Sequence, residues 1–214
     1  RGEESDPFIF RVLSDNVRYP KEVLGDLRAQ VGACRTGARR WQALADKFGA
    51  GVIYDAVQAL QLQGERKARE AIRELPKGEF CAEGFLDDDG VAVDSPTIRV
   101  RVEVKDDEIV FDLTGSSPQC LGPVNCGAPT ALAACRIAFK TLTDPFSPGN
   151  DGFFRPLRLI LPDDCFLNAR EPAPASMYGS GPRMLIELII RALAPAVPNR
   201  VAAGQYGDVC TFAL

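Results

Sequence analysis

The absence of histidine limits the chemistry that the side chains of this 214-residue chain can do. Histidine is the usual general base beside a serine or cysteine nucleophile, and it is a frequent zinc ligand. The composition therefore excludes a Ser-His-Asp triad, a Cys-His dyad and an HExxH zinc helix within this chain. Catalysis here has to use carboxylates, lysine, tyrosine, cysteine or backbone N–H groups, or groups supplied from outside the chain.

The first candidate for ligand binding is a loop of small residues at 112–118, Asp-Leu-Thr-Gly-Ser-Ser-Pro. It follows a predicted strand, and such a loop can present backbone N–H groups to an anion or an oxyanion. It is not a P-loop, because the GxxxxGK[ST] pattern is absent. A plain connection between two elements is the alternative that the loop composition favours.

The second candidate lies at 150–156, where an amide, a carboxylate and a guanidinium surround a glycine. Arg155 can form a bidentate pair with a carboxylate. That carboxylate would belong to a substrate, or else to Asp112 or Asp151, which would make Arg155 a structural clamp. We favour the clamp, because arginine near buried turns commonly ties backbone and carboxylates together.

Three other motifs allow chemistry but have simpler interpretations. The acidic motif at 87–90 offers ligands for a hard cation, but the twelfth position counted from its first aspartate is Ile98, not the glutamate of an EF-hand, so a polar turn is favoured. Residues 178–181 lack the first glycine of GxSxG, which favours a flexible loop. Cys120 and Cys126 have no activating base, which favours packed thiols.

Long helices are predicted in the first third of the chain. Apolar residues recur in alternating steps of three and four and predict a helical seam made of Leu24, Leu27, Val31, Cys34, Ala38, Trp41, Ala45 and Phe48. A second helix, at 53–75, stops at Pro76. Two long helices joined by a short glycine turn predict an antiparallel hairpin. We expect core packing along the seam, with docking of another subunit as the alternative.

The rest of the chain predicts a sheet with further helices. Period-two alternation and short apolar runs indicate strands, and longer apolar stretches indicate helices. The predicted elements are strands at 79–86, 97–104, 109–113, 157–161 and 209–214 and helices at 128–142 and 182–194. The fold class is therefore α+β, with a long N-terminal helical hairpin packed with a mixed or antiparallel sheet and further helices. We expect a helical hairpin region at 1–78 and an α/β region at 79–214.

The overall composition excludes several classes of protein. A net charge of −4 argues against nucleic-acid binding, which needs a basic face. No apolar stretch approaches the roughly 20 residues that cross a bilayer, so no membrane partner is expected. Seven cysteines at scattered spacings, without a CxxC pair, indicate buried reduced thiols and a cytoplasmic protein. Because the first residue is not methionine and the last run is apolar, we expect a portion of a longer protein.

Several stretches, read together, resemble the hydantoinase B/oxoprolinase family. They occur in the family's order and run almost from end to end of the chain, at 1–3, 16–18, 22–30, 37–40, 86–90, 111–119, 122–125, 150–156, 167–168 and Pro172. Their collinearity carries the resemblance. The chain departs from the family pattern at 177–183 and 206–210, so the resemblance leaves the substrate open.

The resemblance implies a subunit, or a C-terminal half, of an ATP-dependent enzyme that opens cyclic amides such as hydantoins and 5-oxoproline. A hydantoinase A-type subunit or domain would bind ATP and Mg and would activate the amide by phosphorylation. No cofactor is expected in this chain, and a divalent metal of the family would lie in an N-terminal part that this chain lacks. A small-molecule substrate and a homo-oligomer are also expected.

The family-like positions are expected to bind substrate, as a pocket wall or an interdomain contact. They are Asp112, Thr114, Gly115, Ser116, Asn125, Asn150, Gly152 and Arg155. No catalytic residue is carried over from the family. Two alternatives stay open: a subunit of a ketone carboxylase of the acetone or acetophenone type, and a non-catalytic assembly module that docks the ATP-binding partner.

Overall fold

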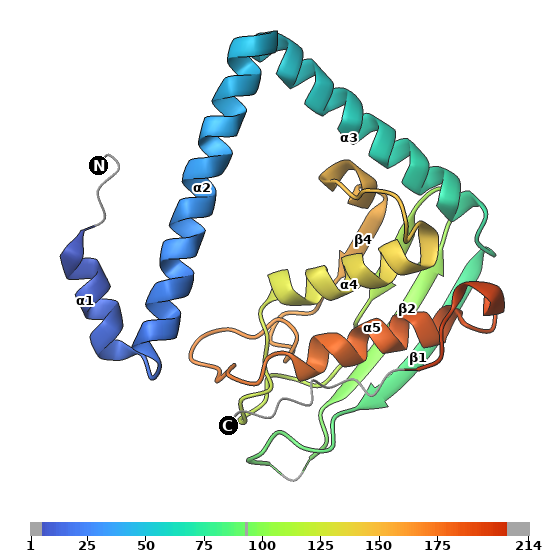
Figure 1. Cartoon of the computed structure of the whole chain (residues 1–214). Helices are drawn as coiled ribbons and strands as arrows, with labels where there is room; N and C mark the ends of the chain where they lie inside the picture. The colour runs from blue at the N-terminus through green and yellow to red at the C-terminus, as the bar shows by residue number, and fades with distance from the viewer. Residues whose placement is uncertain (1–5, 93, 205–214) are drawn as a thin grey trace. The chain divides into compact units, whose positions relative to one another are not determined.

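The computed structural model describes residues 6–92 and 94–204 (Figure 1). The chain forms two compact units, Arg1–Gln58 and Ala59–Leu214. The division falls within helix α3 (Ala50–Arg73), and the region boundary expected at residue 78 stays a prediction. The strand predicted at 209–214 and the departure from the family pattern at 206–210 lie outside the described residues.

The first unit is helical and contains α1 (Pro7–Asn16), α2 (Pro20–Phe48) and the beginning of α3. Asp6 caps α1 by accepting a hydrogen bond from the Phe8 N–H at 2.9 Å. Gly49 ends α2 with a φ of +86°, in the left-handed region that favours glycine. The two predicted long helices are confirmed, whereas α1 was not predicted.

The apolar seam of α2 contains no buried residue. Helix α1 packs against α2, and the Arg28 guanidinium lies 5.3 Å from the centre of the Phe10 ring. The first three seam residues are half-buried, but Cys34, Trp41 and Phe48 are exposed. The expected core packing of the seam is therefore wrong for the described part of the chain, because an apolar pattern shows that a face needs a partner without showing which.

The second unit is built on a four-stranded sheet in the order β1-β2-β3-β4. Its strands are β1 (Gly78–Phe85), β2 (Thr97–Val104), β3 (Ile109–Asp112) and β4 (Leu157–Ile160). Antiparallel pairing joins the first three strands, and β4 pairs parallel with β3. The parallel return needs a crossover, which contains helix α4 (Ala128–Thr143). The predicted α+β class is confirmed, and the sheet is mixed.

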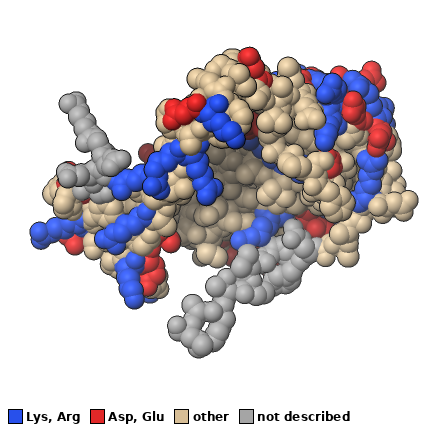
Figure 2. Space-filling view, turned by 45° about the horizontal axis from the view of Figure 1, so that its top comes forward, with Lys and Arg blue, Asp and Glu red and all other residues tan. Residues whose placement is uncertain are grey.

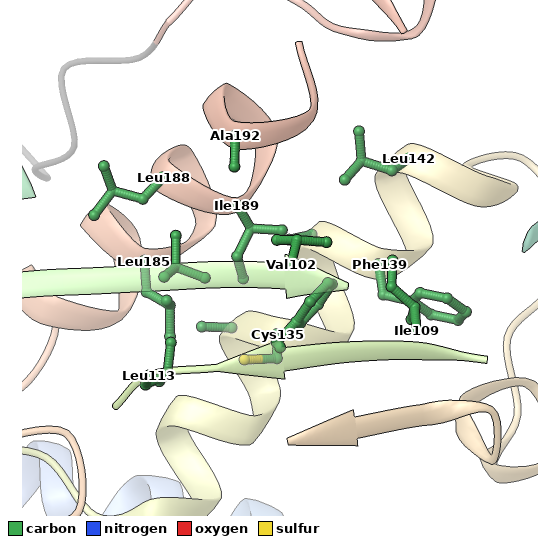
Figure 3. Packing of buried hydrophobic residues seen from close by; sticks show 14 of the residues in the cluster. Val102, Ile109, Leu113, Cys135, Phe139, Leu142, Leu185, Leu188, Ile189 and Ala192 are labelled. Atoms are coloured by element: carbon green, nitrogen blue, oxygen red, sulfur yellow. The ribbon is translucent and has the colours of Figure 1, made fainter. Parts of the chain in front are cut away.

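Helices α4 and α5 (Ser180–Leu193) cover one face of this sheet (Figure 1). Figure 3 shows side chains from both helices around Val102 of β2, among them Phe139 of α4 and Ile189 of α5. Alternate residues of β2 point into this core and are nearly or fully buried: Ile98, Val100, Val102 and Val104. Since strand residues alternate between faces, Arg99 and Arg101 lie on the opposite face of the sheet.

Candidate functional site

The loop after β3 begins with a buried carboxylate, that of Asp112. Its Oδ2 accepts a hydrogen bond from Arg101 Nη2 at 2.7 Å, and its Oδ1 accepts one from the Thr114 N–H at 2.9 Å. Burial alone would raise the pKa of Asp112, but the hydrogen bonds from Thr114 and Arg101 outweigh it and hold this pKa below its ordinary value. The carboxylate therefore anchors the loop and is a weak base at neutral pH.

The next residues of the loop continue along β2. Gly115 has a φ of +90°, and its carbonyl accepts a hydrogen bond from Arg99 Nη1 at 3.1 Å. Ser116 Oγ accepts from the Arg99 N–H at 3.0 Å and donates to the Arg99 carbonyl at 3.2 Å. The serine hydroxyl thus takes the place of backbone partners that a longer β3 would supply. Thr114 and Gly115 stay exposed.

A hollow of about 560 Å³ lies on the sheet beside this loop. Its lining consists of Cys81, Ala82, Glu83, Arg99, Val100, Arg101, Asp112 and Thr114. The two guanidiniums pair with carboxylates of β1, Arg99 with Glu83 and Arg101 with Glu79 at 3.2 Å. Cationic donors, the guanidiniums, and anionic acceptors, the carboxylates, therefore lie next to one another in the hollow. Such a lining suits a small neutral polar group such as an amide, which both donates and accepts hydrogen bonds.

Asn125 lies outside this hollow and is fully buried. Its Oδ1 accepts a hydrogen bond from the Cys120 N–H at 2.8 Å, and its Nδ2 donates to the carbonyls of Cys120, Gly122 and Pro174, each at 2.9 Å. The side chain therefore ties one loop to another that follows 49 positions later. All of its polar atoms have partners within the chain.

The acidic motif at 87–90 forms a turn held by the buried carboxylate of Asp89. Its Oδ1 accepts from the N–H groups of Val91 and Ala92, and its Oδ2 accepts from the Gly122 N–H at 2.8 Å. These bonds, with the one from Gly122 foremost, lower the pKa of Asp89. The turn that we favoured is the one observed. Among the described residues, no group of three or more metal-ligating side chains could hold a metal ion.

Residues 151–154 form a short 3-10 helix against α3. Asn150 caps this helix, and its Nδ2 donates to the Leu60 carbonyl of α3 at 2.9 Å. Gly152 is buried, and a Cβ added to it would lie 2.0 Å from the Gln61 carbonyl oxygen. The two backbones approach so closely that only glycine fits at this position.

Arg155 is a structural clamp, as we favoured, but it pairs with a carboxylate other than the two predicted. Its Nη1 donates to Glu65 Oε2 at 3.0 Å, and its Nη2 donates to Gln61 Oε1 at 2.9 Å. The predicted partners, Asp112 and Asp151, are therefore wrong. Hydrogen bonds from Arg155 and then from Arg69 lower the pKa of Glu65.

The structure brings together only part of the predicted substrate-binding set. Residues 112–116 form one group on the sheet, Asn125 lies in a buried loop, and residues 150–155 form a group on α3. Contact of any of them with substrate stays a prediction. The sequence reasoning missed the charged partners on the sheet and on α3: Glu79, Glu83, Arg99, Arg101 and Glu65. Alternating charges at 99–103, on the polar face of a predicted strand, were the available signal.

Ser180, from the motif at 178–181, is the first residue of α5 and is not part of a free loop. It lines a second hollow, of about 520 Å³, together with Phe85, Asp87, Met177 and other residues.

On the face shown in Figure 2, acidic and basic side chains are interspersed. None of the described helices combines the length and apolar character needed to cross a membrane.

The stability of the fold is expected to fall in acid, as carboxylates with lowered pKa values, such as that of Asp112, become protonated. The folded-state pKa of Asp112 lies below its ordinary value of 3.8, so its contribution is complete above that value and is lost as the pH falls through the folded pKa. The melting temperature should therefore hold down to about pH 5 and drop below pH 4. In Asp112→Asn, the melting temperature should be lower than that of the original chain at pH 7, and this difference should shrink as the pH falls to 3. A difference in melting temperature that does not depend on pH would contradict this role for the charge.

The cysteines are expected to differ widely in reactivity. Burial raises the pKa of Cys126 and of Cys135 to about 12, whereas Cys34 and Cys81 are exposed. At pH 7.5, N-ethylmaleimide should modify the exposed pair at least about 100-fold faster than the buried pair, because the thiolate is the nucleophile. Peptide mass spectrometry measures each rate, with urea-unfolded chain as the control. Equal rates in the folded chain would contradict the burial.

Comparisons with known proteins agree with this fold. The family model described as Hydantoinase B/oxoprolinase matches residues 1–214. A protein of Pseudomonas sp. (strain NS671), named as the B-type subunit of a D-/L-hydantoinase, is 34% identical over 210 residues, 92% of this chain and 35% of that protein. The crystal structure of the ATP-dependent caprolactamase from Pseudomonas jessenii matches with a TM-score of 0.84 and 26% identity, over 92% of this chain and 34% of that chain.

A nucleotide-free structure of an acetone carboxylase also shares the fold, with a TM-score of 0.80 and 15% identity, over 92% of this chain and 28% of that chain. The architecture is thus shared with one part of the caprolactamase chain and one part of the acetone carboxylase chain. The chain belongs to the hydantoinase B/oxoprolinase family. It spans about a third of the length of the hydantoinase and caprolactamase relatives described above.

Proposed function

We propose that this chain is part of the B-type subunit of an ATP-dependent enzyme that opens cyclic amides, and that the enzyme acts with an A-type subunit or domain. The observation that best supports this is the likeness to the ATP-dependent caprolactamase in both sequence and structure. Caprolactam, hydantoin and 5-oxoproline share an amide within a ring. The proposed substrate class is therefore a small ring that contains an amide.

The contribution of this chain to the reaction is to position the ring. The A-type subunit would bind ATP and Mg and activate the amide oxygen, and any divalent metal would be held by B-type polypeptide outside this chain. In the hollow on the sheet, Arg99 and Arg101 can donate to the amide carbonyl, and Glu83 can accept from the ring N–H. No residue of the hollow is assigned as a base.

The remaining predicted site residues support this hollow from a distance. Asn125 fixes the loops at one end of the sheet, and Asn150, Gly152 and Arg155 fix α3. The six free cysteines of the described residues, of which Cys126, Cys135 and Cys165 are buried, support a cytoplasmic location. We also propose a homo-oligomeric assembly, as the resemblance to the family implies.

The activity is tested on the complete B-type polypeptide that contains this chain, purified with its A-type subunit. Hydantoin, 5-oxoproline and caprolactam are supplied with and without ATP, and both ADP and the ring-opened product are measured. We expect ring opening of at least one compound that depends on ATP. Consumption of none of them in the presence of ATP would contradict the proposed substrate class.

A variant of the hollow tests its role in binding. In the complete enzyme, Arg101→Gln is expected to raise the KM for the ring about tenfold, because it removes a charged donor from the hollow and leaves Asp112 without its ion-pair partner. Arg158→Gln, an exposed position on β4, is the matched control and should leave the KM unchanged. An unchanged KM in Arg101→Gln would favour the non-catalytic assembly module.

The carboxylase alternative rests on the fold shared with the acetone carboxylase. It is tested in the same preparation by adding labelled bicarbonate and a ketone with ATP. Label in an acid-stable product would favour the carboxylase, and absence of label together with ring opening would favour the hydrolase.

A further inference from the structure

Strand β4 forms one edge of the sheet and pairs only with β3 among the described residues (Figure 1). The Ile109 N–H donates to the Pro156 carbonyl at 3.0 Å. Two turns of the pattern later, the Leu113 N–H donates to the Ile160 carbonyl at 2.9 Å. In a parallel pair, every second residue directs its backbone groups to the neighbouring strand, so Pro156, Arg158 and Ile160 face β3 in this way.

The backbone N–H and C=O groups of the alternate residues, Leu157, Leu159 and Leu161, point away from β3. We call these groups the free edge of β4, because the sheet of the described residues has no strand that bonds them. A row of donors and acceptors of this kind is a template for pairing with a further strand. The described part of the first unit is almost entirely helical, and helices bond their own backbone groups, so it has no strand to offer to this edge.

An apolar hollow of about 470 Å³ adjoins the free edge of β4. Leu159 lies opposite the buried Phe111 of β3, so its side chain points to the face of the sheet that carries α4. The side chains of residues 157, 159 and 161 are nevertheless only half-buried, so the cover by α4 stops short of this edge. The hollow is lined by Ala128, Pro129 and Leu132 at the beginning of α4, together with Leu159, Leu161 and Asn168.

We propose that a further strand, contributed by the part of the B-type polypeptide that lies outside this chain, pairs with the free edge of β4 and places apolar side chains in this hollow. The unbonded backbone groups select an extended segment, because only a strand presents donors and acceptors at the matching spacing. The hollow beside them selects apolar residues at every second position of that strand. The inference rests on the part of the proposed function that places this chain in a longer B-type polypeptide.

The length of the free edge favours a strand of the same polypeptide over a separate chain. Strand β4 has four residues and is about 13 Å long. An edge of this length cannot by itself supply the roughly 1,200 Å² that stable interfaces between separate chains bury. A segment of the same polypeptide is held nearby covalently, so a smaller contact is sufficient to bind it. This chain matches only 34% of the caprolactamase chain, so that relative has ample polypeptide for such a segment.

The end of the described chain lies at the other side of the sheet. A Cβ added to Gly204 would lie 2.9 Å from Glu187 Oε1 of α5, and α5 packs on β1 and β2. In the strand order, β1 is the edge opposite to β4. The chain therefore leaves the described part beside the β1 half of the sheet, which favours polypeptide outside this chain as the source of the strand at β4.

Hydrogen exchange resolved to single amides tests the added strand in the complete B-type polypeptide without the A-type subunit. The outer amides, those of Leu157, Leu159 and Leu161, would bond to the added strand. The amides of Arg158 and Ile160 face β3 and are the internal controls. Each rate is divided by that of an unstructured peptide. We expect the outer amides and the controls to differ by less than about tenfold, because both sets then exchange only after local opening. A larger difference, with the outer amides faster, would show an unpaired edge and overturn the proposal.

A substitution in the hollow tests whether the same strand fills it. In the complete polypeptide, Leu132→Gln should speed exchange of the Leu159 amide about tenfold, because it removes an apolar contact of the added strand, and should change that of Arg158 by less than about twofold. The matched control is Ile137→Gln, at an exposed position of α4 outside the hollow, which should change both by less than about twofold. Equal effects of the two substitutions on Leu159, or a rise at Arg158 as large as that at Leu159, would overturn the role of the hollow.

Other occupants of the edge give different results, and each would overturn the proposed source of the strand. Protection of the outer amides only after the A-type subunit is added would assign the edge to that subunit. Protection that rises with the concentration of the B-type polypeptide would assign it to a second copy. Loss of protection in Phe212→Ser would assign it to residues 209–214 of this chain. A polypeptide that opens no cyclic amide can still protect these amides, so this test is separate from that of the substrate class.

Discussion

Replacing Asn125 with alanine is expected to lower the free energy of unfolding by about 3–5 kcal/mol. The side chain is fully buried and makes four hydrogen bonds to the backbone of Cys120, Gly122 and Pro174. Alanine leaves one N–H and three carbonyls without these partners, and each unsatisfied buried group costs about 1–3 kcal/mol. Urea unfolding followed by circular dichroism measures the loss.

The matched control is Asn168→Ala, which removes a similar side chain with a single hydrogen bond, from Nδ2 to the Pro162 carbonyl at 3.1 Å. Its expected cost is about 1 kcal/mol. Equal costs for the two variants would contradict the anchoring role of Asn125. In the complete enzyme, a raised KM without a loss of stability in Asn125→Ala would instead indicate direct contact with substrate.

Periodicity in the sequence is sufficient for elements whose partners lie within this chain. The strand predicted at 97–104 is β2 without a shift, because its alternate residues fill the core beneath α5. The same reasoning finds α2 but misjudges its surroundings, since an apolar seam has the same pattern whether its partner is inside or outside the chain. Helix α1 has fewer than three turns, which is too short for a periodic pattern to stand out.

The partners of the polar residues are less predictable. Two of the three bonds to the Asp89 carboxylate come from residues two and three positions later, so the turn was predictable from its composition. Arg155, by contrast, pairs with Glu65, 90 positions earlier, and no local pattern encodes that choice. The pairing with Glu65 depends on how residues 150–155 lie against α3. The glycines at the contact between this loop and the helix determine that placement.

Replacing one of these glycines, Gly152, with alanine is expected to cost about 2–4 kcal/mol. The added Cβ would lie 2.0 Å from the Gln61 oxygen, 2.6 Å from its carbonyl carbon and 2.7 Å from its Cα. These atoms belong to the backbone of α3, so relief of the overlap has to move the helix or the loop and not merely a side chain. Urea unfolding measures the cost.

Two controls separate the backbone approach from the ion pair beside it. Arg155→Ala should cost only about 0.5–1 kcal/mol, because the Arg155 and Glu65 side chains are 42% and 23% exposed and water screens their attraction. Gly149→Ala places a methyl 3.6 Å from Lys140 Cε, an ordinary contact, and should change stability by less than about 1 kcal/mol. A loss in Gly152→Ala no larger than these would contradict the close approach.

A second glycine allows a stricter test of the same contact. A Cβ on Gly64 of α3 would lie 2.4 Å from Asn150 Oδ1 and 3.0 Å from the Phe153 nitrogen, so it would press on the same loop from the helix side. Once one methyl has separated the two backbones, the other should meet less resistance. The double variant should therefore lose less stability than the sum of the two single variants, by at least about 0.5 kcal/mol. Additive losses would show that the two glycines relieve separate contacts.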